Sequence, residues 1–265
     1  MTESESDSRL LAGCRGLVLG VSTENSTGFQ CARALSGFGA RVAVTCRPTR
    51  KSAVSELVRE FDGLALGLEA TEEESFDRAF AEIEREFARL DFLVHTLVHV
   101  PDGALTRPSY ELSAEEFGQV MDIGVRSLLA ACKRALPLFA GSEHPRVVAL
   151  ISAGSEFVIP RYHVVGMAKA ALASAVRYLA QELGPLGVLC NTLSFSIIDT
   201  DAARRVIGAD VTQQTRNYLA KRAMTGARLE FEHVTNAVAF LASPLCANLT
   251  GETVNVDGGF SRNYF

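Results

Sequence analysis

The alternation of short apolar runs with longer segments of helical period limits most strongly what this chain can fold into. Seven runs rich in Val, Leu and Ile are predicted as strands, at residues 16–20, 41–46, 64–68, 92–97, 146–152, 188–193 and 253–256. They are apolar nearly throughout, as expected for strands covered on both faces of a parallel sheet. Segments of helical period lie between them, at 28–38, 51–61, 72–88, 114–139, 162–183 and 232–242. This order predicts an α/β protein with a doubly wound parallel sheet.

No proline-rich or low-complexity linker divides the chain, so we predict one Rossmann-type domain of about seven strands over residues 10–265, with helices on both faces. Residues 1–9 are acidic and polar and are expected to be a disordered tail. The polar stretch 200–221 interrupts the alternation directly after a strand. Since open α/β sheets bind ligands beyond the carboxyl ends of their strands, this stretch is predicted to be a substrate-covering lid.

Composition excludes several classes of function. Hydrophobic residues make up 48% and charged residues 22% of the chain, which indicates a globular protein with a large core. A formal net charge of −5 argues against nucleic acid as a partner. The apolar runs are too short to span a membrane, and the first residues lack a signal-peptide pattern, so we expect a cytoplasmic protein. The six cysteines and five histidines show no metal-ligand spacing, and we predict no metal site.

A tyrosine and a lysine, Tyr162 and Lys169, lie seven residues apart in one predicted helix. Seven residues make almost two helical turns, so the two side chains drift only about 20° around the axis and project from one face. A phenol beside a cation is a proton donor whose pKa the cation can lower. The spacing also occurs by chance between unrelated surface residues, and by itself it is weak evidence.

Two loops indicate a binding site for a dinucleotide. The first strand leads through Gly20-Val-Ser-Thr-Glu-Asn-Ser26-Thr27-Gly28 into a helix, whose free N–H groups can bind a pyrophosphate. The spacing is not G-x-G-x-x-G, and a tight turn would look similar. The second strand ends at Arg47, where NAD-binding folds usually carry an acidic residue. A basic residue suits the 2′-phosphate of NADPH, which we predict over NADH, although a solvated basic loop would also explain it.

With these motifs in one order, the chain resembles the short-chain dehydrogenase/reductase superfamily, and most closely its enoyl-acyl-carrier-protein reductase branch. That branch combines a loop of the form G-x5-S-x-[AG] with Y-x6-K, whereas ordinary ketoreductases use Y-x3-K. Further matching pieces are Ile159-Pro-Arg-Tyr162, Val176-Arg-Tyr-Leu-Ala180, Asn191 and the segment from Thr250 to Ser261. The resemblance extends over residues 11–262.

The resemblance implies a role for each candidate residue. Tyr162 would stabilise the oxygen that gains negative charge, and Lys169 would bind the nicotinamide ribose and lower the pKa of the phenol. Gly20, Ser26 and Gly28 would line the pyrophosphate site, and Glu69 would lie near the adenine. The remaining residues implied at the cofactor site are Thr27, Arg47, Ala70, Val98, Ile198 and Thr200. The substrate would be an acyl thioester or a ketone, with an acyl carrier protein as one carrier, and the assembly a homotetramer or homodimer.

Three departures from the branch leave the reaction open. Ser152 stands where the branch has a second aromatic residue, and carbonyl-reducing relatives use such a serine to bind a ketone, although it could merely fill space. Val98 replaces a glycine beside the cofactor, and Phe195-Ser-Ile-Ile stands where the family usually has a Gly-Pro or Pro-Gly element beside the nicotinamide. We therefore expect an enoyl-thioester reductase acting on a specialised substrate. The alternatives are a carbonyl reductase using Ser152, Tyr162 and Lys169, or a binding or regulatory homologue with a degraded site.

Overall fold

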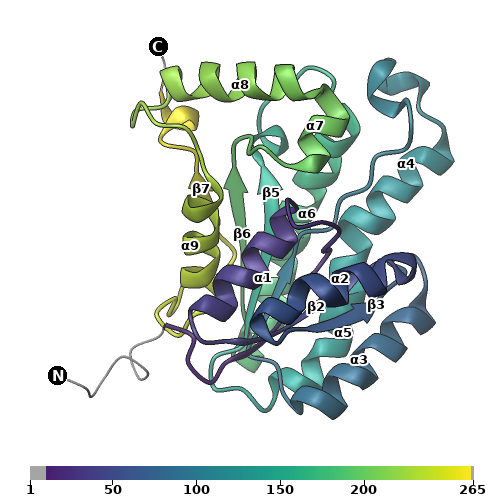
Figure 1. The fold of residues 1–265 in the computed structure, drawn as a ribbon, viewed down its shortest axis with the longest axis vertical. Helices are drawn as coiled ribbons and strands as arrows, with labels where there is room; N and C mark the ends of the chain where they lie inside the picture. Colours follow the sequence, from purple (N-terminus) through teal and green to yellow (C-terminus); the bar gives the residue numbers. More distant parts are fainter. Residues whose placement is uncertain (1–9, 264–265) are drawn as a thin grey trace.

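The predicted apolar runs form one seven-stranded parallel sheet in the computed structural model, which describes residues 10–263 (Figure 1). The strand order is β3-β2-β1-β4-β5-β6-β7, so the chain reverses its direction of winding between β1 and β4. The doubly wound sheet is thereby confirmed. The strands are β1 Arg15–Leu19, β2 Arg41–Cys46, β3 Leu64–Gly67, β4 Phe92–His95, β5 Arg146–Ser152, β6 Leu189–Phe195 and β7 Thr253–Val256. The acidic tail expected at residues 1–9 lies outside the described residues.

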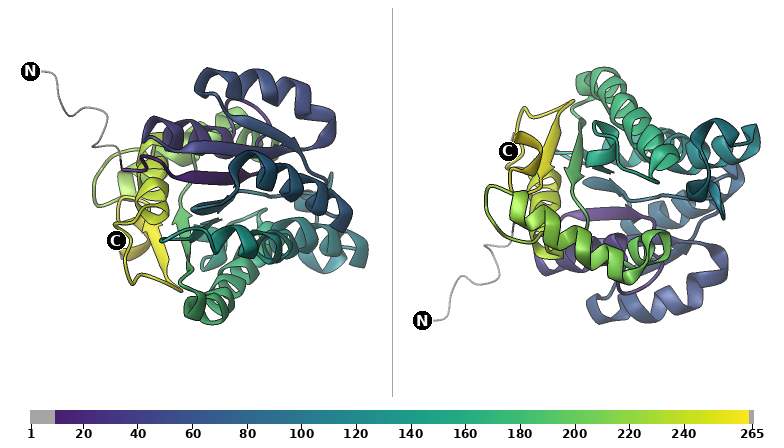
Figure 2. Two further views of the ribbon diagram at one scale, coloured as in Figure 1. Left: turned by 90° about the horizontal axis from the view of Figure 1, so that it is seen from below. Right: turned by 90° about the horizontal axis from the view of Figure 1, so that it is seen from above.

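Helices cover both faces of the sheet, as Figure 2 shows from two sides. The side chains of α1 Thr27–Gly37, α2 Lys51–Val58 and α9 Phe231–Ala242 pack in one core cluster. Those of α3 Glu73–Phe87, α5 Ser127–Phe139 and α6 His163–Leu183 pack in another. The strands β1 to β6 are sandwiched between these layers, which explains why they are apolar nearly throughout, whereas the edge strand β7 is only partly buried.

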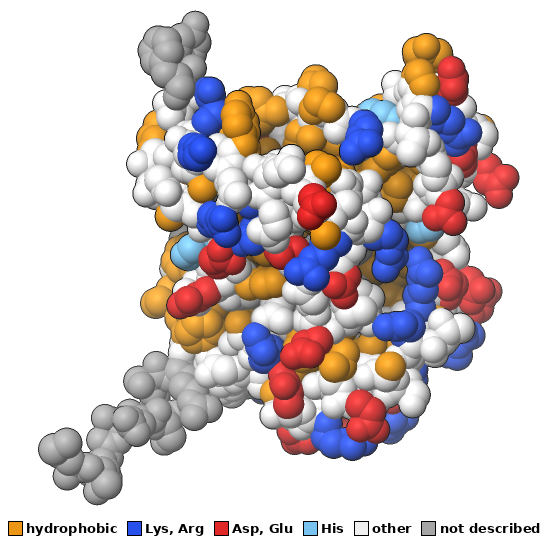
Figure 3. All heavy atoms as spheres, turned by 45° about the horizontal axis from the view of Figure 1, so that its top comes forward, with side chains coloured by type: hydrophobic (Ala, Val, Ile, Leu, Met, Phe, Trp, Pro, Cys, Tyr) orange, Lys and Arg blue, Asp and Glu red, His pale blue; other side chains and the backbone are white. Residues whose placement is uncertain are grey.

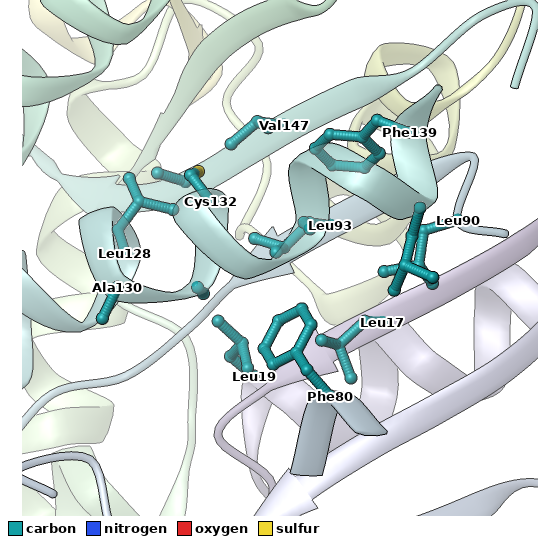
Figure 4. Close-up of a cluster of buried hydrophobic side chains, with 14 of the residues drawn as sticks. Leu17, Leu19, Phe80, Leu90, Leu93, Leu128, Ala130, Cys132, Phe139 and Val147 are labelled. Atoms are coloured by element: carbon teal, nitrogen blue, oxygen red, sulfur yellow. The ribbon is translucent and has the colours of Figure 1, made fainter. Parts of the chain in front are cut away.

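The two cores take alternate residues of the same strands. Leu17, Leu19 and Leu93 face Phe80 of α3 and Leu128 of α5 in the core of Figure 4. Val18, Phe92 and Val94 belong to the opposite core. Because successive side chains of a strand point to opposite faces, two buried faces require an apolar residue at every position.

Two predicted segments differ from the structure. The single helix predicted over 114–139 is divided into α4 Ala114–Met121, a π-helical turn Asp122–Arg126 and α5. The polar stretch 200–221 contains two helices, α7 Asp201–Ile207 and α8 Ala209–Arg222, which lie across the carboxyl ends of the strands (Figure 1). α8 buries only Thr212 and Arg216, so it lacks the apolar stripe by which an amphipathic helix is recognised.

The face at the carboxyl ends of the strands carries acidic and basic side chains interspersed rather than a field of one sign (Figure 3). Within residues 10–263, none of the helices combines the length and the hydropathy that a membrane crossing requires.

Candidate active site

The turn from β1 into α1 forms a backbone cradle. Gly20 has φ +101°, a left-handed conformation that favours glycine. A Cβ on Gly28 would lie 2.5 Å from the carbonyl oxygen of Gly20, so only glycine allows the helix to start this close to the strand. Ser26 is the N-cap of α1: its hydroxyl accepts a hydrogen bond from the N–H of Phe29 and donates one to the carbonyl of Thr23 at 2.6 Å. Thr27 is the first helical residue.

This cradle fits the pyrophosphate of a dinucleotide. The close packing of Gly20 against Gly28 leaves the backbone without side chains at the turn, and the first N–H groups of α1 and its positive dipole end lie there. The loop also stands beside the switch between β1 and β4, where doubly wound sheets bind nucleotides.

Tyr162 is the N-cap of α6, one residue before the helix begins, and not its first residue as predicted. Its hydroxyl accepts a hydrogen bond from Ser152 at 3.2 Å, so the end of β5 and the start of α6 meet at these two side chains. Gly154 makes room for the phenol, because a Cβ there would lie 2.7 Å from a ring carbon of Tyr162.

The pKa of Tyr162 lies above its ordinary value because the ring is buried, and the hydrogen bond from Ser152 opposes this only in part. The sequence led us to expect a pKa lowered by Lys169. The structure corrects that expectation: among the described residues, Lys169 makes no hydrogen bond to Tyr162, and burial is the dominant influence.

Lys169 lies two turns into α6 with its side chain directed at the sheet. It is 7% exposed, and its Nζ donates to the carbonyl of Leu150 at 2.9 Å and to that of Leu97 at 3.5 Å. Leu97 follows the end of β4 and Leu150 lies two residues before the end of β5, so the ammonium is held near the carboxyl edge of the sheet. Burial lowers the pKa of Lys169 to about 8.

A buried polar pair, His95 with Ser127, lies on the same face of the sheet, and the sequence motifs did not indicate it. His95, the last residue of β4, lies 2.8 Å through Nε2 from the hydroxyl of Ser127, which itself donates to the carbonyl of Ile123. Burial, and next the charge of Lys169, lower the pKa of His95 to about 3, so this imidazole is neutral. A histidine at the end of an otherwise apolar strand was the available signal.

Arg47 and Glu69, two of the predicted adenosine-binding residues, both act on the charge of His99. Burial and next Arg47 lower the pKa of His99, while a hydrogen bond with Gln119 and the charges of Asp102 and Glu69 oppose them. Arg47 is exposed at the end of β2, and Glu69 follows β3. Ala70 is buried, and its carbonyl accepts a hydrogen bond from Arg126.

The remaining predicted residues also lie at this edge. Val98 follows β4 and is 43% exposed. Phe195 is the last residue of β6 and pairs in register with Ser152 of β5, so these two departures from the family pattern are neighbours. Ile198 is buried, and Thr200 is the N-cap of α7, accepting a hydrogen bond from the N–H of Ala203.

Two polar residues of the glycine loop reach the start of α7, a connection that the sequence did not indicate. Thr23 donates to the carboxylate of Asp201 at 2.7 Å, and the amide of Asn25 donates to the same carboxylate at 3.2 Å. Asn25 also donates to the carbonyl of Asp199 at 3.1 Å. The hydrogen bonds from Thr23 and next Asn25 lower the pKa of Asp201, so its carboxyl group is ionised.

A cavity of about 450 Å³ lies elsewhere, between α8 and the end of β7, and its walls include Ile197, Leu219 and Val256 but neither Tyr162 nor Lys169. Within the described part of the chain, His, Cys, Asp and Glu side chains form no group of three that could hold a metal ion. Within the described residues, the phenol of Tyr162 and the hydroxyl of Ser152 meet at the end of β5, and the ammonium of Lys169 is bound to the carbonyl of Leu150 in the same strand.

Nearly the whole chain is similar to known reductases. A family model described as enoyl-(acyl carrier protein) reductase matches residues 20–261. The NADH-dependent enoyl-[acyl-carrier-protein] reductase 1 of Rhizobium meliloti is 32% identical over 96% of this chain and 92% of its own length. The corresponding Escherichia coli enzyme is 34% identical over 95% of each chain.

The solved structures that resemble this chain include enzymes of the same kind. The Aquifex aeolicus enoyl-[acyl-carrier-protein] reductase superposes with a TM-score of 0.89 at 32% identity, over 97% of this chain and 99% of that one. The Bacillus cereus reductase, solved with NADP+ and an indole naphthyridinone, gives a TM-score of 0.91 at 28% identity, over 97% and 100% of the two chains. The resemblance inferred from the motifs is confirmed.

Proposed function

Because the chain belongs to the enoyl-(acyl carrier protein) reductase family of short-chain oxidoreductases, we propose that it reduces the C=C bond of an enoyl thioester carried on an acyl carrier protein. The observation that supports this most is the placement of Tyr162 and Lys169, in the spacing of the branch, beside a cradle that fits a dinucleotide.

The mechanism follows from what these residues can do. A bound nicotinamide dinucleotide would supply the hydride. Addition of hydride to the β-carbon of an α,β-unsaturated thioester breaks the C=C π bond and places negative charge on the thioester oxygen as an enolate forms. A proton from water then completes the reduction at the α-carbon. The Tyr162 hydroxyl donates a hydrogen bond to that oxygen, and the buried Lys169 ammonium supplies positive charge at the same edge. The buried phenol keeps its proton at neutral pH, because its pKa is raised. Tyr162 is thus a hydrogen-bond donor before reaction begins.

The direct test follows the absorbance of NADPH with a crotonyl thioester and, separately, with a β-ketoacyl thioester. We expect oxidation of NADPH with the crotonyl substrate. Turnover of the ketoacyl substrate alone would contradict the proposal. Failure to bind either nicotinamide dinucleotide would contradict reductase activity of any kind and would favour a binding or regulatory role.

One observation favours carbonyl reduction as a second candidate. Ser152 lies within hydrogen-bond distance of the Tyr162 hydroxyl, so a ketone oxygen could receive two donors, with Tyr162 as the general acid. Ser152→Ala separates the two reactions. It should lower turnover of a ketone strongly, whereas reduction of an enoyl thioester, which needs only Tyr162 at its oxygen, should change little.

We also propose a preference for NADPH, supported by Arg47 at the end of β2 and by its charge in the region of His99. Several relatives are named as NADH enzymes, whereas the Bacillus cereus structure holds NADP+. Arg47→Ala should raise the KM for NADPH about tenfold or more and leave the KM for NADH nearly unchanged, because only the 2′-phosphate loses its partner. Arg59→Ala, which removes a comparably exposed arginine paired with Glu56, is the control. Equal changes with both cofactors would contradict the assignment.

We propose a homotetramer as the assembly. The apolar side chains of α5 and α6 are largely turned to the core, yet Leu129 of α5 and Tyr178 of α6 remain 42% and 67% exposed. Such exposed apolar side chains on long neighbouring helices suit a contact between copies. Sedimentation equilibrium should give the mass of four chains, and a monomer would contradict the proposal.

A further inference from the structure

The contact between the glycine loop and α7 spans the sheet. The loop follows β1, whereas Asp199 and Asp201 follow β6, and the order of the sheet places β4 and β5 between these strands. Three strand spacings of about 4.8 Å separate β1 from β6 by roughly 14 Å. Residues after β1 and after β6 can therefore touch only if one segment arches over the carboxyl ends of β4 and β5.

That arch crosses the place where the dinucleotide would lie. The crevice at the switch between β1 and β4 is directly beneath it, and the cradle of Gly20 and Gly28 forms one side. The other side is the segment 199–201 with Thr200 at its centre, a residue that the family resemblance implies at the cofactor site. The hydrogen bonds of Asp201 to Thr23 and Asn25 thus close a ring of protein around the pyrophosphate position.

The far end of the same segment is anchored as well. The carboxylate of Asp199 accepts hydrogen bonds from Arg204 of α7 at 2.6 Å and from Gln213 of α8 at 2.5 Å. Arg216 of α8, which is 7% exposed, binds Glu230 at the start of α9. The helices α7 and α8 are therefore held to the body of the protein at α9. At the other end, the carboxylate of Asp201 and the carbonyl of Asp199 accept the hydrogen bonds that join this segment to the glycine loop.

We propose that Asp201 is a positioning residue that latches the α7–α8 segment over the bound dinucleotide and thereby sets the rate at which the cofactor exchanges. This inference rests on the proposed function, since it assumes a dinucleotide in the cradle. The latch is closed in the structure described here, so a cofactor entering or leaving must first break the hydrogen bonds from Thr23 and Asn25. Both association and dissociation are then slowed by the same closed state.

The kinetic test uses the fluorescence of bound NADPH in a stopped-flow instrument, with excess NADP+ added to displace it. Asp201→Ala should raise the dissociation rate about tenfold or more, because two hydrogen bonds to a charged acceptor are lost. The association rate should rise as well, so the Kd should change less than either rate. Asp201→Asn, which keeps one acceptor oxygen in the same shape, should lie between the wild type and the alanine variant.

A matched control and a double mutant distinguish loss of the Asp201 contact from a general destabilisation of α7 and α8. Asp210 lies in the first turn of α8, is exposed, and makes no hydrogen bond or ion pair within residues 10–263, so Asp210→Ala should leave both rates unchanged. Thr23→Val should accelerate dissociation in the wild type but add little in Asp201→Ala, since Thr23 acts through Asp201. Additive effects would overturn the latch.

Hydrogen exchange tests the latch without cofactor. Amides of residues 201–207 should exchange faster in Asp201→Ala than in the wild type, while those of α9 should not change. If Asp201→Ala still binds NADPH and its dissociation rate stays within about twofold of the wild-type rate, the latch is wrong and the proposed function is unaffected. Absence of any nicotinamide dinucleotide binding would overturn the proposed function together with the latch.

Discussion

At the residue scale, burial acts in opposite directions on the two groups proposed for catalysis. It raises the pKa of the Tyr162 phenol and lowers the pKa of the Lys169 ammonium, so in each case the neutral form is favoured. Hydrogen bonds from the Lys169 ammonium to the carbonyls of Leu97 and Leu150 oppose that effect by stabilising the charge. The phenol therefore enters the reaction protonated, beside a cation whose charge depends on pH in the alkaline range.

Tyr162→Phe should lower kcat by about one to three orders of magnitude and leave the Kd for NADPH nearly unchanged, because only the developing charge on the substrate loses its partner. Steady-state rates with a crotonyl thioester and cofactor titrations measure the two effects. Tyr110→Phe removes a hydroxyl at a position that is 85% exposed and should have no effect. Unchanged turnover in Tyr162→Phe would show that this residue is not the donor.

Lys169 should make stability depend on pH in a definite direction. Its pKa is about 8 in the folded protein and about 10.5 in the unfolded chain, so between these values the unfolded chain binds more protons. The contribution of Lys169 to the free energy of unfolding therefore rises with pH from about 8 to about 10.5 and is constant outside that window. Urea unfolding at a series of pH values gives the free energy of unfolding of the wild type and of Lys169→Met. The difference between the two pH dependences is the contribution of Lys169. A difference that stays flat across the window would contradict the shift.

At the element scale, the β1–α1 turn shows how a local sequence shapes a binding surface. Small residues let the helix begin against the end of the strand, and Ser26 caps it, so the first N–H groups remain available to an anion. A second strained turn precedes the phenol: Arg161 has φ +57°, outside the range that most side chains prefer.

Gly28→Ala should lower the free energy of unfolding by about 1–3 kcal/mol and weaken NADPH binding, because the added Cβ collides with a backbone oxygen that cannot move away cheaply. Gly37→Ala, at the end of the same helix, meets nothing within 4 Å and should be neutral or stabilising by up to about 1 kcal/mol. Denaturant unfolding and cofactor titration measure both variants. Equal behaviour of the two would contradict the close approach at Gly28.

At the scale of the whole molecule, the parallel sheet assembles a site from distant parts of the chain. Gly20, Arg47, Glu69, Val98 and Ser152 each lie at or beyond the end of a different strand, and all five strands point the same way. The carboxyl edge therefore collects these residues whatever their separation in sequence. A ligand that binds them together can bind only the folded chain.

NADPH should consequently raise the melting temperature. At a concentration of about 100 times its Kd the stabilisation is about 2.7 kcal/mol, which corresponds to a rise of about 5–10 °C for a chain of this size. Differential scanning fluorimetry measures it, and Arg47→Ala should reduce the rise with NADPH but not with NADH. A melting temperature independent of both dinucleotides would contradict the site.

Periodicity determined much of this protein from sequence alone. All seven strands and the main helices are where the apolar pattern predicts them. Burial of both sheet faces requires nearly continuous apolar runs, and such runs can be recognised directly in the sequence. The motifs around Gly20, Tyr162 and Lys169 identified the family for a second reason. A close approach of two backbone segments, and a phenol and an ammonium on one helix face, each require particular residues at particular spacings.

Only the tertiary structure decided the rest. The helices α7 and α8 carry no apolar stripe, so their pattern could not predict them, and their position follows from contacts with the glycine loop and α9. Three hydrogen bonds of the site join residues 10 to 178 positions apart in sequence: Ser152 with Tyr162, His95 with Ser127, and Thr23 with Asp201. The burial that raises the pKa of Tyr162 likewise arises only in the folded chain. Spacing along the chain carries no record of such contacts, because the packing of the sheet and its helices creates them.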